Sequence, residues 1–281
     1  MEKITDTGLL AHHNFKLKED EYVIEDVVMC MKCHTPRQMY FGDGLNRMLF
    51  PVECDCQRIE REKREKAEKE REYRNKVELM RNSGIPNPTY RSYRLEKDDN
   101  KTPELTRVIE NYIDNFDRLR ENGQGLLLYG DVGTGKTYYA MCIANALVER
   151  LKNVYCTSLP AVVKMMHDFD NADMHLKRLL TRDLIVIDDL GVERDTGFTM
   201  EQIYGFIDGC NTRKIPMIIT TNLAPSILVK ASQDTSNLTY ARIYSRILEK
   251  CYPVKVNEVK RRAENARQNK MEMAKLLGVE K

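Results

Sequence analysis

The stretch "LYGDVGTGKTYY", residues 128–139, decides the fold of this chain. Its central part, "GDVGTGKT" at 130–137, fits the pattern G-x-x-x-x-G-K-[ST]. The apolar "GLLLY" precedes it, and the helical "YYAMCIANALVERL" follows it. Because a strand, a glycine-rich turn and a helix then direct backbone N–H groups at one point, this order predicts a phosphate-binding P-loop.

The residue types in the turn predict how ATP and Mg²⁺ are held. Glycines let the backbone curl around phosphate oxygens. Lys136 would reach the terminal phosphates, and the Thr137 hydroxyl would ligate Mg²⁺. The competing interpretation, a glycine-rich surface turn, is disfavoured by the correct strand and helix on either side. The predicted nucleotide contacts are Gly130, Asp131, Val132, Gly133, Thr134, Gly135, Lys136, Thr137 and Tyr138.

A second strand candidate ends in acids, in "DLIVIDDLG" at residues 183–191. A P-loop ATPase needs such an acid to hold magnesium and to orient water. Asp188 is therefore the predicted magnesium partner, acting directly or through water. Asp189 is the predicted residue that polarises the attacking water, with Glu193 as a substitute.

A third strand candidate ends in polar residues, in "PMIITTNLAP" at residues 216–225. The Asn222 amide is predicted to sense the γ-phosphate and to position water, with Thr221 behind it. An Asn after a strand more often only begins a turn, so this signal is weak by itself.

Apolar runs that alternate with helical segments predict the fold class. Buried strands separated by helices indicate an α/β fold with a parallel five-stranded sheet flanked by helices. Helical spacing of apolar residues ahead of the first strand predicts one helix over residues 105–116. The strand candidates are residues 125–129, 154–157, 184–188, 217–221 and 253–256.

Charge and hydropathy limit the partners and the cellular location expected for the protein. The 45 Lys and Arg residues nearly cancel the 43 Asp and Glu residues, so the overall charge identifies no partner. No apolar run approaches the roughly 20 residues that cross a bilayer. Residues 1–10 lack the pattern of a signal peptide. We therefore expect a cytoplasmic protein with reduced cysteines.

Four of the eight cysteines are clustered, in "CMKC" at 30–33 and "CDC" at 54–56. The two pairs are separated by twenty residues and predict a structural Zn²⁺ site of Cys30, Cys33, Cys54 and Cys56. His34 could replace one ligand, and four free cysteines are the competing interpretation. Turn formers between the pairs predict a knuckle, a hairpin and a second knuckle, and a short helix or two is expected within the first 29 residues.

A charged segment follows the second cysteine pair. Twelve of the thirteen residues 60–72 are charged, with acids four positions before bases, which predicts an exposed helix. The two prolines of "GIPNPTY" at 84–90 should stop that helix. The predicted domains are a zinc-binding unit (1–57), a charged helical linker (58–83), an ATPase domain (84–262) and a basic tail (263–281).

The order of the P-loop, "IDDLG", "IITTNL", "RIYSRILEKCYPVKV" and "KRR" resembles the bacterial and phage replicative helicase loaders of the DnaC and DnaI type. These are AAA+ ATPases with an IstB-like ATP-binding domain. The resemblance covers roughly residues 84–262 and implies Mg²⁺-dependent ATP hydrolysis.

The resemblance also implies roles for arginines near the end of the ATPase domain. Arg246 corresponds to the arginine finger that acts on ATP bound to a neighbouring subunit. Arg261 or its neighbour Arg262 corresponds to the second sensor, and "NEVKRR" departs from the usual pattern there. A finger acting between subunits implies self-association. The predicted catalytic set is Lys136, Asp188, Asp189, Asn222 and Arg246.

Partners follow from the resemblance as well. The zinc-bearing unit would contact a hexameric DnaB-type helicase, and the ATPase domain would bind single-stranded DNA. Lys164, Lys177 and Arg178 are candidate DNA contacts. The charged segment at 57–76 (net +3) is more often a soluble spacer, and the segment at 255–281 (net +4) is a further candidate for phosphate contact.

The expected function is ATP-dependent loading of the replicative helicase onto single-stranded DNA during replication initiation. The nearest alternative is an IstB-type transposition helper ATPase that acts on duplex DNA with a transposase. A small-molecule P-loop kinase and a zinc-dependent DNA-binding protein with a relic P-loop are further alternatives. No substrate pocket or lid is marked in the sequence, which disfavours the kinase.

Overall fold

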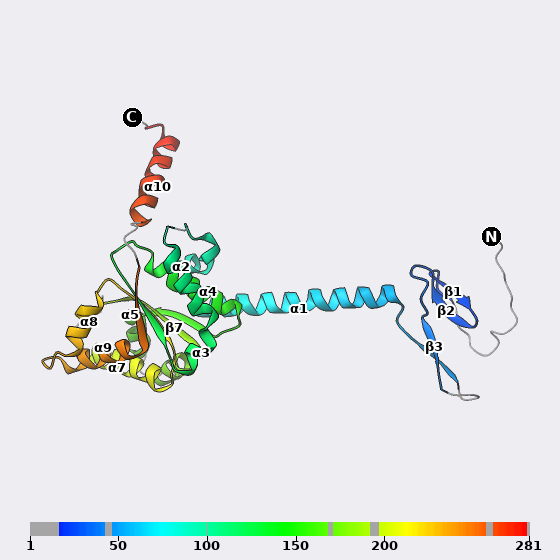
Figure 1. Ribbon diagram of the computed structural model, residues 1–281, viewed down its shortest axis with the longest axis horizontal. Coiled ribbons are helices and arrows are strands. Elements are labelled where there is room, and N and C mark those ends of the chain that lie inside the picture. Colours follow the sequence, from blue (N-terminus) through cyan, green and yellow to red (C-terminus); the bar gives the residue numbers. More distant parts are fainter. Residues whose placement is uncertain are drawn as a thin grey trace. The chain divides into compact units, whose positions relative to one another are not determined.

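The computed structural model describes residues 17–42, 47–99, 101–167, 171–191, 197–256 and 261–279 (Figure 1). The chain divides into two compact units, residues 1–74 and residues 75–281, and the division falls within helix α1 (Asp55–Gly84). Among the described helices, none is long and apolar enough to cross a membrane.

The first unit contains two antiparallel hairpins. Strands β1 (Glu21–Ile24) and β2 (Val27–Cys30) form one, and β3 (Gln38–Phe41) and β4 (Met48–Pro51) form the other. The helix expected within the first 29 residues is wrong for residues 17–29, and residues 1–16 lie outside the described residues. Valine- and isoleucine-containing runs flank Glu25 and Asp26, which both have positive φ, so a tight two-residue hairpin turn decides the local structure.

Helix α1 confirms the prediction of a charged helix. Its arginines pair with glutamates four positions away, as between Arg64 and Glu60 at 3.0 Å and between Arg61 and Glu65 at 2.8 Å. The helix ends at Gly84, ahead of the prolines, as predicted. A Cβ at Gly84 would lie 2.3 Å from the Val154 carbonyl oxygen, so only glycine allows this close approach to the sheet.

The second unit contains the predicted parallel sheet, with five strands in the order β6-β7-β8-β5-β9. All five candidates are strands, and β9 begins two residues earlier than predicted. The strands are β5 (Gly125–Tyr129), β6 (Val154–Ser158), β7 (Leu184–Leu190), β8 (Met217–Thr221) and β9 (Cys251–Lys255). Every described pairing in this sheet is parallel.

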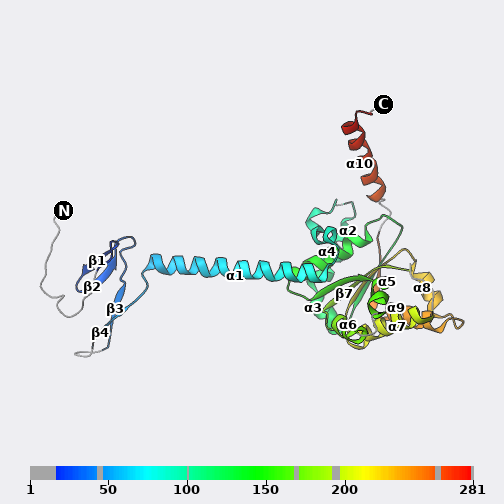
Figure 2. The ribbon, with the colours of Figure 1, turned by 180° about the vertical axis from the view of Figure 1, so that it is seen from behind.

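Helices cover both faces of the sheet, as the two opposite views show (Figures 1 and 2). Two short 3-10 turns, η2 (Pro88–Ser92) and η3 (Leu95–Lys97), follow helix α1. The remaining helices are α2 (Pro103–Asp114), α3 (Phe116–Glu121), α4 (Lys136–Glu149), α5 (Leu159–Met166), α6 (Ala172–Leu179), α7 (Gly197–Thr212), α8 (Pro225–Ser232), α9 (Leu238–Lys250) and α10 (Arg261–Leu277).

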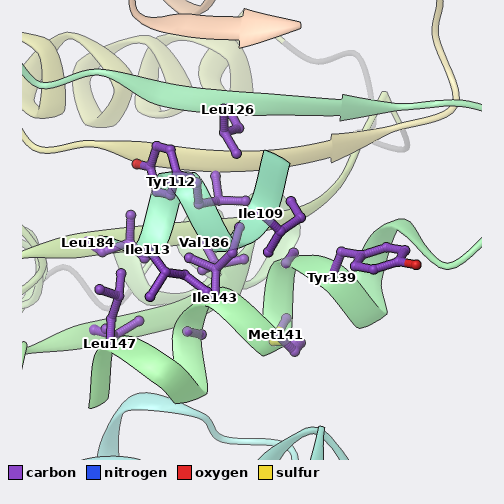
Figure 3. Close-up of a cluster of buried hydrophobic side chains, with 14 of the residues drawn as sticks. Ile109, Tyr112, Ile113, Leu126, Tyr139, Met141, Ile143, Leu147, Leu184 and Val186 are labelled. Carbon is purple, nitrogen blue, oxygen red and sulfur yellow. The ribbon is translucent and has the colours of Figure 1, made fainter. Parts of the chain in front are cut away.

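Two hydrophobic cores lie on the two faces, because successive strand residues point in opposite directions. Leu126 and Val186 pack with α2 and α4 on one face, where Ile109 and Ile143 meet them (Figure 3). The other core contains Leu127 and Ile187 and the apolar residues of α5, α7 and α9. Both faces of the sheet are therefore buried, and the site is expected at the edge where the carboxyl ends of the strands lie.

Candidate functional site

The predicted nucleotide residues meet at the carboxyl edge of the sheet. Strands β7, β8 and β5 are neighbours in that order, so the residues that follow them converge. A cavity of about 720 Å³ opens there and is lined by the P-loop, Asp189, Asn222 and Arg262. The sheet order thus brings together residues distant in the chain, such as Lys136 and Asn222, which are 86 positions apart.

The P-loop has the conformation that its glycines predict. Gly130, Gly133 and Gly135 have φ of 150°, 85° and 103°, a region that other residue types rarely adopt. Helix α4 begins at Lys136, directly after the loop. The N-terminus of a 14-residue helix therefore points its free N–H groups at the cavity, as phosphate binding requires.

The ammonium group of Lys136 is held by three oxygens. Its Nζ donates to the carbonyls of Gly130 at 3.0 Å and Asp131 at 2.7 Å, and to Asn222 Oδ1 at 2.8 Å. Burial lowers the pKa of Lys136. The lysine and the amide predicted as γ-phosphate sensor are thus in direct contact, although Lys136 begins α4 and Asn222 follows β8.

Asp188 accepts two hydroxyl hydrogen bonds on one oxygen. Thr137 donates to Oδ1 at 2.9 Å, and Thr220 donates to the same atom at 2.7 Å. Burial raises the pKa of Asp188. A hydroxyl beside a carboxylate supplies the oxygen ligands that Mg²⁺ prefers, so this pair fits the ion. Thr220 was not predicted from the sequence, which pointed only to its neighbours Thr221 and Asn222.

Asp189 lies at the cavity wall in an unusual backbone conformation. Its φ is 59°, and its N–H donates to Thr220 Oγ1 at 2.9 Å. This backbone conformation directs the Asp189 side chain away from that of Asp188 and toward the cavity. In contrast, the Thr221 hydroxyl donates to the Leu190 carbonyl at 2.8 Å and so links β8 to β7. Glu193 lies outside the described residues.

An aromatic wall completes the cavity on the side of the 3-10 turns. Tyr90, Tyr93 and Tyr138 line it, and the Tyr93 and Tyr138 ring centroids are 5.1 Å apart. The Tyr138 hydroxyl donates to the Arg94 carbonyl at 2.5 Å. Only Tyr138 belongs to the predicted P-loop contacts, because Tyr90 lies in the predicted helix stop and Tyr93 just after it, far from the P-loop in the sequence.

The second-sensor candidates lie at the start of α10. Arg262 lines the cavity, and its N–H donates to the Gly133 carbonyl at 3.3 Å. The side chain of Arg261 lies outside the described part of the chain. Of the two candidates, Arg262 is thus the one whose described position borders the nucleotide cavity.

Arg246 is not among the described residues that line this cavity. It lies on α9, where its side chain is 45% exposed and its Nε is 3.1 Å from Asp208 Oδ1. The carboxylate of Asp208 raises the pKa of the Arg246 guanidinium. Its neighbour on the same helix, Arg242, lies over the Tyr204 ring.

The candidate DNA contacts occupy the α5–α6 region. Lys177 and Arg178 are exposed on α6. Lys164 borders a second cavity of about 650 Å³, which His175 and Asp188 also line. No sequence motif predicts this cavity beside Asp188.

The four clustered cysteines meet in the first unit. The sulfurs of Cys30, Cys33, Cys54 and Cys56 all lie within 4.8 Å of one another. Tetrahedral zinc with Zn–S bonds of about 2.3 Å sets its sulfurs about 3.8 Å apart, so the donor set fits this ion. The Thr35 hydroxyl lowers the pKa of the Cys33 thiol, whereas the neighbouring Cys54 and Cys30 raise the pKa of the Cys56 thiol.

His34 is not one of the four clustered donors. Its Nδ1 lies 3.0 Å from the Tyr22 hydroxyl. The other four cysteines are single buried residues of the second unit; they are Cys142, Cys156, Cys210 and Cys251.

Comparison with known proteins identifies a family with similar sequences. The family of IstB-like ATP binding proteins matches residues 62–269. The replicative helicase loader DnaI of Bacillus subtilis is 25% identical over 149 residues. The replicative helicase loader DnaC of Escherichia coli K12 is 28% identical over 141 residues. The DnaI match covers 50% of this chain and 48% of DnaI. The DnaC match covers 48% of this chain and 56% of DnaC. The matched part of the chain thus spans about half the length of these relatives.

Solved structures show the same fold. A crystal structure of DnaI has a TM-score of 0.52 at 22% identity, covering 62% of this chain and 93% of that one. A crystal structure of the DnaC helicase loader has a TM-score of 0.52 at 24% identity, covering 61% and 100%. The second unit therefore has the same fold as these two structures, and the chain belongs to the IstB-like ATP-binding protein family.

Proposed function

We propose that this chain is an ATP-dependent loader that binds a hexameric DnaB-type replicative helicase and delivers it onto single-stranded DNA during replication initiation. The observation that carries the proposal is the assembly of the P-loop, Asp188 and Asn222 at one sheet edge, in a chain similar to two helicase loaders. ATP hydrolysis would release the loader from the helicase.

The proposed reaction is Mg²⁺-dependent hydrolysis of ATP. Lys136 would bind the terminal phosphates, and Thr137 and Asp188 would hold the ion, which their 2.9 Å contact supports. Asp189 would polarise the attacking water from the cavity wall, and Asn222 would contact the γ-phosphate. Arg262 is the better-supported second sensor because it borders the same cavity.

Arg246 would complete the site of a neighbouring subunit. Its exposure and its position away from the cavity of its own chain support this assignment. A contact of this kind joins subunits head to tail and therefore implies self-association. Arg246→Ala should reduce hydrolysis at least about 100-fold while ATP affinity stays within about twofold.

Mixing two inactive variants tests the assignment directly. Lys136→Ala has an intact finger but a disabled site, and Arg246→Ala has an intact site but lacks the finger. If the finger acts between subunits, the mixture hydrolyses ATP although neither variant does so alone. Arg213→Ala, at an exposed arginine directly after α7, is the control for loss of a surface charge. An Arg246→Ala variant that cannot bind ATP would place the arginine in its own cavity.

The first unit would grip the helicase, with its cysteine centre as the structural support. Single-stranded DNA would contact the α5–α6 region, where Lys164, Lys177 and Arg178 lie. Purified chain, ATP and the replicative helicase of the same cell should form a complex that transfers the helicase onto single-stranded DNA. No complex by size-exclusion chromatography, with metal bound and ATP present, would contradict the loader function.

The alternative is a transposition helper that acts on duplex DNA with a transposase, and the IstB-like family match favours keeping it. The two functions differ in the nucleic acid that each requires. Equilibrium binding with labelled strands at one fixed salt concentration distinguishes them. A loader prefers single-stranded DNA, whereas a helper prefers the duplex.

A further inference from the structure

Arg37 lies buried beside the cysteine centre. Its side chain is 9% exposed, which is rare for an arginine unless it is paired. One guanidinium nitrogen is 2.6 Å from Asp20 Oδ2, and the other is 2.7 Å from Glu21 Oε1. The nitrogen bound to Asp20 also lies 3.5 Å from Cys30 Sγ, within reach of an N–H···S hydrogen bond. Arg37 thus joins two carboxylates to a candidate metal ligand.

Thr35 makes a second contact with the cysteine cluster. Its hydroxyl oxygen accepts the N–H of Asp55 at 2.9 Å and lies 3.1 Å from Cys33 Sγ. Because the oxygen accepts from Asp55, its own proton is available for the sulfur. Asp55 stands between Cys54 and Cys56, so this one hydroxyl connects the two knuckles.

We propose that Arg37 and Thr35 are outer-shell positioning residues of a four-thiolate metal site. Four thiolates around a divalent ion carry a net charge of −2. Hydrogen bonds from outer residues draw charge from the sulfurs and fix their directions. Arg37 supplies the charged donor to Cys30, and Thr35 supplies the neutral donor to Cys33.

The backbone of Arg37 allows the side chain to be tested separately. Its N–H donates to the Val28 carbonyl at 2.7 Å, and its carbonyl accepts from Val52 at 2.8 Å. These bonds link the two hairpins whatever side chain the position carries. Substitution of Arg37 therefore removes the guanidinium and leaves the chain path in place.

The fork of the guanidinium explains why arginine suits this position. Its planar donors reach Asp20, Glu21 and Cys30 together, whereas a lysine ammonium is a single point charge. Arg37→Lys should keep the charge but lose part of the geometry. Arg37→Gln removes the charge and leaves two carboxylates beside the thiolates without their cation.

The experiment uses the full chain with Zn²⁺ or Co²⁺. Zinc affinity is measured by competition with a chelator, and the sulfur-to-cobalt charge-transfer band reports the electron density on the thiolates. Arg37→Gln should weaken zinc binding about 10- to 100-fold and shift the band. Arg37→Lys should recover part of both effects, and Thr35→Val should show a smaller shift.

Two controls separate this role from simple ion pairing. Arg58→Gln removes an exposed arginine from the start of α1. Asp20→Asn breaks the ion pair but keeps Arg37 beside Cys30, so the cobalt band should stay unchanged. If Arg37→Gln lowers affinity without moving the band, Arg37 serves only to pair Asp20 and Glu21, and the proposal fails. A wild-type chain without bound metal, or variants within twofold of wild type, would also overturn it.

Discussion

The nucleotide cavity and the cysteine centre are held in place by different means. Beneath the nucleotide cavity, Leu127, Leu128 and Ile219 are fully buried in a sheet packed on both faces. Around the cysteine centre lie two short hairpins, and apolar residues such as Phe41 and Phe50 remain exposed. A packed sheet positions its site before any ligand binds, whereas we expect a unit with so little core to need a bound metal in order to fold.

Breaking the cysteine centre should have the largest effect. Cys54→Ser, or removal of metal with a chelator, should unfold the first unit and leave the second intact. Segment-resolved hydrogen exchange should show that β1–β4 lose protection at least about 100-fold, while β5 and β8 keep theirs. Met31→Ser, an exposed position between two of the cysteines, is the matched control. Retained protection in Cys54→Ser would contradict the difference between the regions.

A methyl group added inside the packed sheet should destabilise the second unit instead of the first. A Cβ at Gly125 would lie 1.8 Å from the Met217 carbonyl oxygen, a backbone atom that cannot move away cheaply. We expect Gly125→Ala to lower the free energy of unfolding of the second unit by about 3–5 kcal/mol. Gly205→Ala on α7 meets nothing within 4 Å and should stabilise by about 0.5–1 kcal/mol. Denaturant titration compares the two alanines; equal effects would contradict the close approach.

Loss of the P-loop lysine should affect ligand binding rather than folding. Lys136→Ala should weaken ATP binding about 100-fold or more, because the predicted role of its ammonium is to pair with the terminal phosphates. Calorimetric titration of ATP measures this, with exposed Lys230→Ala on α8 as the control. If ATP binding and hydrolysis persist in Lys136→Ala, the P-loop is a relic.

A smaller effect is expected from Thr220. Thr220→Val keeps the shape but removes the hydroxyl that donates to Asp188 and accepts from Asp189. Hydrolysis should fall about 10-fold while ATP affinity stays within about twofold, because both aspartates lose their orientation. Thr212→Val, at an exposed position of α7, is the control. An equal loss in affinity and turnover would instead indicate a general role in folding.

The smallest predicted effect concerns stability. Burial raises the pKa of Asp188, so its ionised form costs stability in the folded protein at neutral pH. Asp188→Asn should therefore raise the melting temperature of the second unit by about 2 °C without ligand. Mg²⁺ with ATP should stabilise the wild type more than this variant. A lower melting temperature in Asp188→Asn would show that its hydrogen bonds outweigh the cost of burial.

The sequence was most informative where local pattern and tertiary burial agree. Strands such as β5 could be predicted because they are runs of apolar residues, and the P-loop because its glycines and lysine are close together in the sequence. Thr220, Tyr90 and Arg37 were missed because their contacts join segments distant in the chain. The first hairpin was missed because its turn contains Glu25 and Asp26 rather than glycine.

The three hydrogen bonds of Lys136 have a consequence for how the site responds to its ligand. The ammonium group has three protons, and each has an oxygen partner within 3.0 Å. A phosphate that approaches Lys136 must therefore compete with oxygens already in place, so binding is an exchange of partners. If a phosphate displaced Asn222 Oδ1, the Asn222 amide would lose its contact with Lys136. We therefore expect the hydrogen bonding at the end of β8 to depend on whether the site is occupied.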